Sequence, residues 1–345
     1  MPRTVSQGLA EVRARVAGLS PGWLAAGLAL VVVLAVALVT KPGLFVDNAI
    51  GGLVYGMILV MVALGLSLIL GLMGVVNFAH GALFMLGAYF AWQVVAAMGL
   101  PFWAALAVAP VAVGLVGVLV EVTVLRNIYD EEPTIGLLAT FGLTMMLEEV
   151  VRGVWGAAPK SFELPAVLAT NTSLGVTQVG TFRLFMVGVS ALSILLVYLL
   201  ITRTDFGLTV RAGVQDSEMT AFLGVDLPLR FTAMFFLGAV IAGVGGVLRG
   251  AEVGMGPGMA EKFVILAFVV VVVGGAGSLF GSVAAGILIG EAQYLSTVVL
   301  TAWADVTGVQ AINVGGLEGL VPYLVMLVVL LVRPRGLFGE EGFLE

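Results

Sequence analysis

Long apolar stretches separated by short polar segments occupy most of this chain. A stretch of about 17–25 apolar residues can cross the ~30 Å hydrocarbon core of a bilayer as a helix. The pattern predicts nine or ten crossings, because one stretch, Val264–Gly275, is short enough to be a half-helix or a re-entrant segment. The predicted crossings are Gly22–Val39, Ala49–Leu70, Ala82–Met98, Ala104–Leu125, Ile135–Val151, Leu184–Ile201, Phe231–Leu248, Val264–Gly275, Val283–Leu300 and Gly319–Val332.

The composition supports the same picture for the whole protein. Hydrophobic residues make up 61% of the 345 positions and charged residues only 10%, whereas about 25% of the residues in soluble domains are charged. We therefore expect an all-α, polytopic integral membrane protein with glycine-broken or re-entrant segments. The net charge of −6 indicates no particular partner, and nucleic acid is not expected.

The chain contains no cysteine and one histidine. This excludes disulfides, thiolate ligands and thiol catalysis, and it makes a zinc site built from the protein alone improbable. No cluster of histidines or paired carboxylates falls within a predicted span. We therefore expect no catalytic residue, no metal site and no cofactor in this chain.

The basic residues predict the orientation. With the N-terminus in the cytoplasm, nine of the 15 lysines and arginines fall on the inner side and six on the outer side. Residues 1–21 and 333–345 are then cytoplasmic. The three arginines before Gly22–Val39 and the Ala35-Val36-Ala37 sequence also resemble a cleavable secretory signal, but the apolar length favours a retained helix.

Two long connections lie on opposite predicted faces. Residues 153–183 form the outer connection, which is either a folded cap or a simple connector. Within it, Lys160-Ser161 resembles part of a Walker-type phosphate-binding loop, but Pro159 stands where that loop needs a glycine. Any nucleotide hydrolysis must therefore take place on another chain. The inner connection, 202–230, predicts one short amphipathic helix after Thr209 that ends at Gly224. This helix is either a cytoplasmic peg or a helix lying in the membrane interface.

Polar residues and glycines interrupt two of the apolar stretches. Two blocks share this arrangement of glycines and polar residues between apolar halves, as the repeats of many transporters do. They are GLMGVVNFAHGALFMLGA and VGGAGSLFGSVAAGILIG. Broken backbone at membrane depth needs protein or a water-lined cavity around it, which favours a translocation pathway. Alternatively, Gly71, Gly74, Gly274 and Gly277 only allow close helix packing.

Several polar side chains inside the spans have open roles. His80 could relay protons or bind substrate, but we favour a structural hydrogen bond to a freed carbonyl, and Asn77 could cap the following helix. Glu148–Arg152 and Arg249–Glu252 have the spacing of intrahelical ion pairs. Glu291 interrupts Val283–Leu300 without a sequence-local partner, so it faces either the pathway or a partner permease.

Three ordered blocks carry a family resemblance: NFAHG, RAGVQDSEMTAFLGVD and VVVVVGGAGSLFGSVAAGILIGEA. Together they resemble the permeases of branched-chain amino acid ABC importers, the LivH-like family, which includes urea and amide permeases. The resemblance covers roughly residues 46–339. The predicted helix Gly22–Val39 lies before the matching region and looks like an additional N-terminal helix attached to the core of the family.

The resemblance implies roles for particular residues. The family's cytoplasmic coupling segment, which docks on the ATP-binding subunit, corresponds to Arg211, Ala212, Asp216, Met219, Leu223 and Gly224. The first signature, expected along the pathway, corresponds to Asn77, Phe78, Ala79, His80 and Gly81. The second corresponds to Gly274, Gly275, Gly277, Ser278 and Gly281.

The resemblance also implies a mechanism and partners. It implies one permease subunit of a bacterial inner-membrane importer, working by alternating access with two ATPase subunits that use ATP and Mg²⁺. It further implies a second related, LivM-like permease or a second copy, and a periplasmic binding protein. An ion-coupled secondary transporter is the rival class, but it would need coupling-ion ligands inside the membrane, and midplane aspartates are missing. A channel or a membrane enzyme fits less well.

Overall fold

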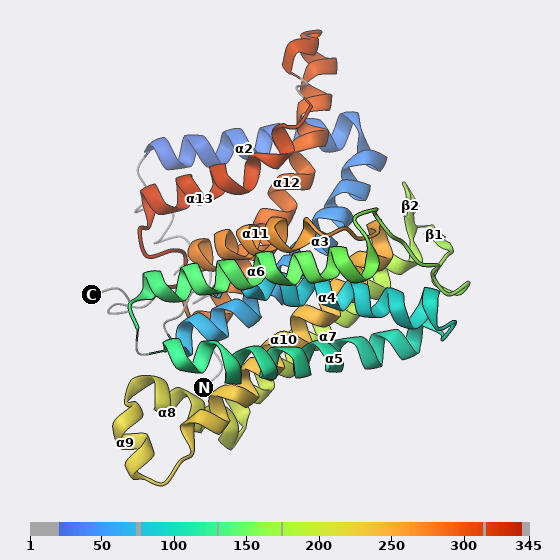
Figure 1. The fold of residues 1–345 in the computed structure, drawn as a ribbon. Helices are drawn as coiled ribbons and strands as arrows, with labels where there is room; N and C mark the ends of the chain where they lie inside the picture. Colours follow the sequence, from blue (N-terminus) through green and yellow to red (C-terminus); the bar gives the residue numbers. More distant parts are fainter. Residues whose placement is uncertain (1–20, 74–76, 130, 174, 313–314, 340–345) are drawn as a thin grey trace.

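The computed structural model describes residues 21–73, 77–129, 131–173, 175–312 and 315–339. The predicted cytoplasmic segment before residue 21, the proposed pathway or packing residue Gly74 and the last six residues lie outside the described ones. Most of the described chain is helical, and the expected all-α membrane fold is confirmed (Figure 1).

The helices follow the apolar stretches closely. Short 3-10 or π helices occur at Gln93–Ala97, Leu125–Ile128, Gln310–Ile312 and Leu317–Gly319. The α-helices are α2 (Pro21–Thr40), α3 (Pro42–Met73), α4 (Ala79–Trp92), α5 (Phe102–Thr123), α6 (Pro133–Trp155), α7 (Thr181–Arg203), α8 (Asp205–Gln215), α9 (Ser217–Phe222), α10 (Leu227–Val253), α11 (Met259–Gly274), α12 (Leu279–Thr307) and α13 (Val321–Val332).

Seven helices of the described chain are long and apolar enough to cross a membrane. They begin at Pro42, Ala79, Phe102, Thr134, Thr181, Leu227 and Leu279. The predicted stretch at Val264 forms α11, whose 16 residues extend only about 24 Å at 1.5 Å per residue. It is therefore shorter than the hydrocarbon core, as its sequence suggested.

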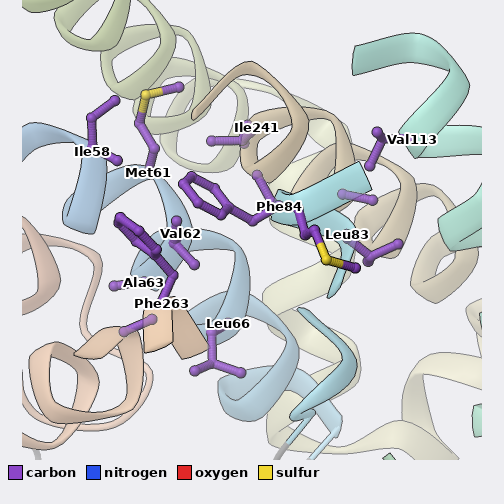
Figure 2. Close-up of a cluster of buried hydrophobic side chains, with 14 of the residues drawn as sticks. Ile58, Met61, Val62, Ala63, Leu66, Leu83, Phe84, Val113, Ile241 and Phe263 are labelled. Carbon is purple, nitrogen blue, oxygen red and sulfur yellow. The ribbon is translucent and has the colours of Figure 1, made fainter. Parts of the chain in front are cut away.

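The interior of the bundle is formed by α3, α4, α10 and α11. In α3, 89% of the most apolar window is buried, against 22% in α7, so α7 contributes to the lipid-facing surface. Phe84 and Phe263 stack within this interior with ring centroids 4.4 Å apart, next to Ile58 and Met61 (Figure 2).

Glycines bring the interior helices into close contact. A methyl group at Gly246 of α10 would overlap the Phe84 carbonyl of α4, and one at Gly290 of α12 would overlap Gly52 and Gly56 of α3. Because lipid tails are as apolar as leucine, van der Waals packing rather than apolar burial stabilises such contacts. The many glycines inside the spans therefore have a structural role.

Two structures extend from opposite ends of the bundle (Figure 1). Within the 153–183 connection, β1 (Asn171–Ser173) and β2 (Gln178–Gly180) form an antiparallel hairpin with Thr172 opposite Val179. Helices α8 and α9 project from the other end. We call these the hairpin end and the knob end, and the α8–α9 pair the knob.

Candidate functional site

The knob consists of two helices rather than the single helix predicted after Thr209. The backbone at Asp216 is extended, with φ −154° and ψ 94°, and its carboxylate accepts a hydrogen bond from the Met219 amide at 2.8 Å. Asp216 is therefore the N-cap of α9, a role that competes with continuing a helix. Gly224 has φ +84° immediately after α9, so the predicted stop at this glycine is confirmed.

The tip of the knob is apolar and exposed. Met219 is 57% exposed, Phe222 78% and Leu223 77%. The polar residues Arg211, Gln215 and Glu218 are also exposed, while Val210 is buried against the bundle. Exposed apolar side chains gathered on a projecting element are typical of a protein-docking surface.

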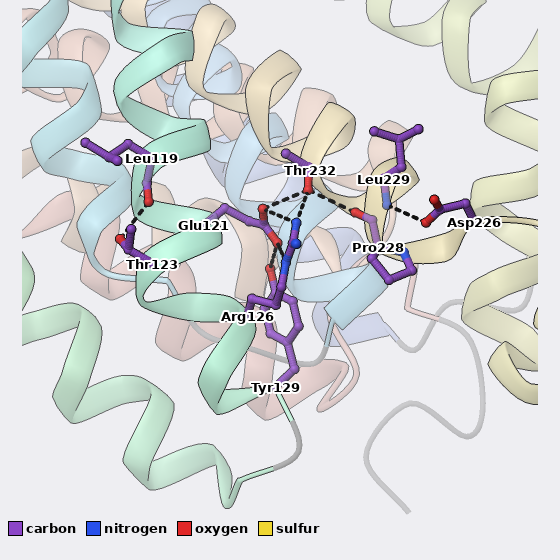
Figure 3. A network of polar contacts seen from close by, with 9 residues as sticks. All are labelled: Leu119, Glu121, Thr123, Arg126, Tyr129, Asp226, Pro228, Leu229 and Thr232. Atoms are coloured by element: carbon purple, nitrogen blue, oxygen red, sulfur yellow. Dashed lines mark hydrogen bonds and ion pairs between the residues drawn. The ribbon is translucent and has the colours of Figure 1, made fainter.

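A buried carboxylate fixes the base of the knob through long-range contacts that no pattern in the sequence predicts. Glu121 is fully buried near the end of α5 and accepts hydrogen bonds from Arg126, Tyr129 and Thr232 (Figure 3). The distances are 3.1 Å from Arg126 Nη2, 3.1 Å from the Tyr129 hydroxyl and 2.8 Å from the Thr232 hydroxyl. Burial, together with the neighbouring Glu121 charge, raises the pKa of Tyr129 above an ordinary value that already lies above neutral, so the hydroxyl is protonated and donates.

Thr232 lies in the first turns of α10, directly after the knob. The Glu121 network therefore ties the helix that follows the knob to the end of α5 (Figure 3). In the sequence, only Glu121 followed by Arg126 was visible, because Thr232 is 111 positions away from Glu121.

The first signature lies deep inside the chain. Asn77 and His80 are both fully buried. The Phe78 amide donates to Thr140 Oγ1 at 3.1 Å, and the centroid of the Phe78 ring lies 6.3 Å from the ring centroids of both Phe141 and Phe268. These contacts attach the start of α4 to α6 and α11.

The predicted cap at Asn77 is wrong. Phe78 is the N-cap position of α4 and has no side-chain cap, and no hydrogen bond joins the Asn77 amide to another described residue. The Val62 carbonyl lies beside His80, but no hydrogen bond of normal geometry joins them. Gly65 leaves the space for the imidazole, because a Cβ there would overlap its Nε2 atom.

The second signature forms a capped turn between α11 and α12. Gly275 and Gly277 have φ of +100° and +78°, conformations that favour glycine, and Ser278 caps α12 by accepting from the Gly281 amide at 3.0 Å. Residues near the C-terminus pack on this turn, where the amides of Leu337 and Phe338 donate to Val273 and Gly274 at 2.8 and 3.0 Å.

The two signatures are not brought together. Gly81 packs on Ala260 and Val264 in the first half of α11, whereas Gly274 and Gly281 contact each other at its far end. Close packing, the alternative role given for Gly274, is visible there, and Gly81 is packed as closely. Their predicted role in lining a pathway stays a prediction.

Two predicted ion pairs have different outcomes. Arg249 pairs with Glu252 as expected, at 2.5 Å. Arg152 instead pairs with Glu149, with Nε and Oε1 3.2 Å apart, while Glu148 turns toward the backbone at Glu261 on α11. The helix spacing allowed both partners.

Glu291 lies between α12 and α3. Its Cα and Oε2 would be 2.9 and 3.0 Å from a methyl group at Gly52, and it forms no hydrogen bond or ion pair with another described residue. The predicted role of Glu291 toward the pathway or a partner permease stays a prediction.

Comparison with known proteins identifies the family. A profile of the family described as branched-chain amino acid transport system / permease component matches residues 48–330. The high-affinity branched-chain amino acid transport permease protein BraD of Pseudomonas aeruginosa is 28% identical over 310 residues, covering 86% of this chain and 96% of BraD.

Two further relatives have similar coverage. LivH of Escherichia coli K12 is 28% identical over 315 residues, covering 86% of this chain and 96% of LivH. A probable LivH of Methanocaldococcus jannaschii is 26% identical over 299 residues, covering 84% of this chain and 91% of that protein. The chain therefore belongs to the branched-chain amino acid transport permease family and is a multi-pass membrane permease.

Proposed function

We propose that this chain is a permease subunit of an ATP-driven importer for branched-chain amino acids, working by alternating access in the bacterial inner membrane. Its partners are two ATPase subunits, a second related permease or a second copy, and a periplasmic binding protein. The knob end faces the cytoplasm, as the distribution of basic residues predicts, and the hairpin end faces the periplasm.

The exposed apolar tip of the knob is the observation that carries this proposal. Phe222 and Leu223 project from the bundle at the end where an ATPase would dock. The Glu121 network connects the base of α10 to α5, so movement of the knob would pass to both helices. Helix α10 in turn packs tightly on α4, through the contact between Gly246 and Phe84.

Replacing Phe222 with serine is expected to weaken ATPase binding by at least about tenfold, because buried aromatic anchors often contribute more than ~2 kcal/mol to an interface. Co-purification of the ATPase at graded detergent and salt concentrations measures this effect. Phe222 is preferable to Asp216, whose substitution would also remove the cap of α9.

The matched control for Phe222→Ser is Val167→Ser. Val167 is 76% exposed, close to the 78% of Phe222, but lies in the connection at the hairpin end. This control should bind the ATPase like the wild type. Equal ATPase recovery with Phe222→Ser and Val167→Ser would refute the assignment of the knob as a docking surface.

The substrate class is tested with the complete reconstituted complex and its binding protein. Uptake of leucine, isoleucine and valine should exceed uptake of phenylalanine, urea and short amides, and it should require ATP hydrolysis. Preferential uptake of urea or amides would replace the proposed substrate. Uphill uptake by the purified permease alone would reject the ATP-driven mechanism.

A further inference from the structure

A cavity at the hairpin end gathers positive charge. It has a volume of about 600 Å³, is open to the surface, and lies between the connection after α6 and the α10–α11 turn. Lys160, Arg249 and Lys262 line it, and no carboxylate is among its lining residues. This volume falls within the range of small-molecule sites.

The walls of this cavity are held together by backbone contacts. Lys160 and Met255 exchange two backbone hydrogen bonds, at 2.9 and 2.8 Å. Gly254, with φ +81°, allows this approach, since a Cβ there would lie 2.9 Å from the Lys160 carbonyl oxygen. The connection is therefore fixed on the α10–α11 turn, and the position of Lys160 does not depend on a free loop.

The two lysines carry charge that the described residues do not neutralise. The Lys160 ammonium lies 4.4 Å from the centre of the Trp92 ring, a cation–π contact that keeps its charge. Neither Lys160 nor Lys262 forms an ion pair with another described residue. Each can therefore accept an anionic partner without breaking an existing pair.

Arg249 adds a third cation whose pairing is incomplete. Its Nη1 donates to Glu252, while its Nε is buried and has no partner among the described residues. Glu252 is also shared with Arg183, whose Nε lies 3.4 Å from Glu252 Oε1. Arg183 has a second partner in Asp47, with Nη1 and Oδ1 3.2 Å apart, so the unpaired positive charge of the cavity rests on Lys160 and Lys262.

The helix that borders the cavity has its N-terminal end, the positive end of its dipole, at the cavity. Helix α11 has 16 residues, and Gly258, its N-cap, provides no side-chain cap. Gly258 and Met259 both line the cavity, so the N-terminal end of the α11 dipole lies there, with Glu261 in the same first turn but outside the cavity lining. Apolar side chains form another part of the wall, namely Val253, Met255, Met259 and Phe263.

We propose that this cavity binds the carboxylate of an amino acid during its transfer from the binding protein into the permease. The cations and the α11 N-terminus would bind the carboxylate, and the apolar wall would contact an aliphatic side chain. This inference rests on the proposed function and makes it more specific, because urea and short amides have no charge for Lys160 and Lys262 to recognise.

The test uses the reconstituted complex with its ATPases and binding protein. The K160Q/K262Q variant removes both lysine charges, and K160R/K262R retains them. K41Q is the control for lysine loss, since Lys41 pairs with Asp305 on the exposed surface, outside the cavity. Two quantities are measured: leucine uptake at saturating binding protein, and the affinity of the substrate-free binding protein for the complex.

We expect leucine uptake by K160Q/K262Q to fall at least about tenfold, because the substrate carboxylate would lose two charged hydrogen-bond donors. Binding-protein affinity should stay at the wild-type value and K41Q should transport normally, while K160R/K262R, which keeps both charges, should lose less uptake than K160Q/K262Q. Unchanged uptake by K160Q/K262Q would overturn the inference. A fall in affinity that matches the fall in uptake would also overturn it, because the lysines would then bind acidic groups of the binding protein.

These outcomes separate the inference from the proposed function. A wild-type complex that imports no branched-chain amino acid rejects the proposed function itself. A wild-type complex that imports leucine, together with fully active K160Q/K262Q, rejects only the carboxylate site.

Discussion

An alanine at Gly246 is expected to destabilise the permease by about 3 kcal/mol or more, at the upper end of overpacking effects. The added methyl would overlap the Phe84 carbonyl oxygen and lie 3.0 Å from its carbon and 3.1 Å from the Ala88 amide nitrogen. These are backbone atoms, so no side-chain rotation can relieve the overlap. Helices α4 and α10 would have to separate in the region shown in Figure 2.

Thermal unfolding in detergent measures this effect. Gly188→Ala in α7 and Gly142→Ala in α6 are the matched controls, since a Cβ at either position meets nothing within 4 Å. Both controls should melt at or slightly above the wild-type temperature, because alanine is favoured over glycine in a helix. If Gly246→Ala melts together with these controls, the close α4–α10 contact is wrong.

Replacing Glu121 with glutamine is expected to cost about 3 kcal/mol of stability, because one partner of a buried ion pair is lost. Arg126 would lose its counter-charge, and Tyr129 and Thr232 would share a weaker acceptor. The loss should stay near the low end for buried pairs, since the Arg126 side chain is 39% exposed and can turn toward water.

The same substitution at Glu149 provides the comparison. Its pair with Arg152 has a similar N–O distance, 3.2 Å against 3.1 Å for the Glu121 pair, but the Glu149 side chain is 74% exposed. Exposed pairs contribute about 0–1 kcal/mol, so Glu149→Gln should melt close to the wild type. Equal unfolding temperatures for the two variants would show that Glu121 does not hold α10 to α5.

Local features of the coupling region were predicted only in part. The stop at Gly224 was correct, because a left-handed backbone at a helix end favours glycine regardless of surroundings. The single helix after Thr209 was wrong. Asp216 could have continued that helix, but it caps the next one instead, and sequence periodicity does not distinguish the two.

The polar residues inside the membrane were harder to interpret. The sequence showed that Asn77, His80 and Glu291 lie within apolar stretches, where polar groups are expensive. It could not show that Gly65 makes room for His80 or that Glu291 lies beside Gly52. Both contacts join residues from different helices, so they depend on how the helices pack.

By itself, the sequence determined the class of protein, the positions of most spans, the family and the likeness of two glycine-rich blocks. These properties depend on the length of each apolar segment and on the local order of its residues. Each segment must meet the requirements of the membrane on its own. Only the tertiary structure decided that Glu121 joins Thr232, that Arg152 pairs with Glu149, and that Lys160 and Lys262 share a cavity. Such contacts arise from helix packing across large sequence separations, and no local pattern encodes their geometry.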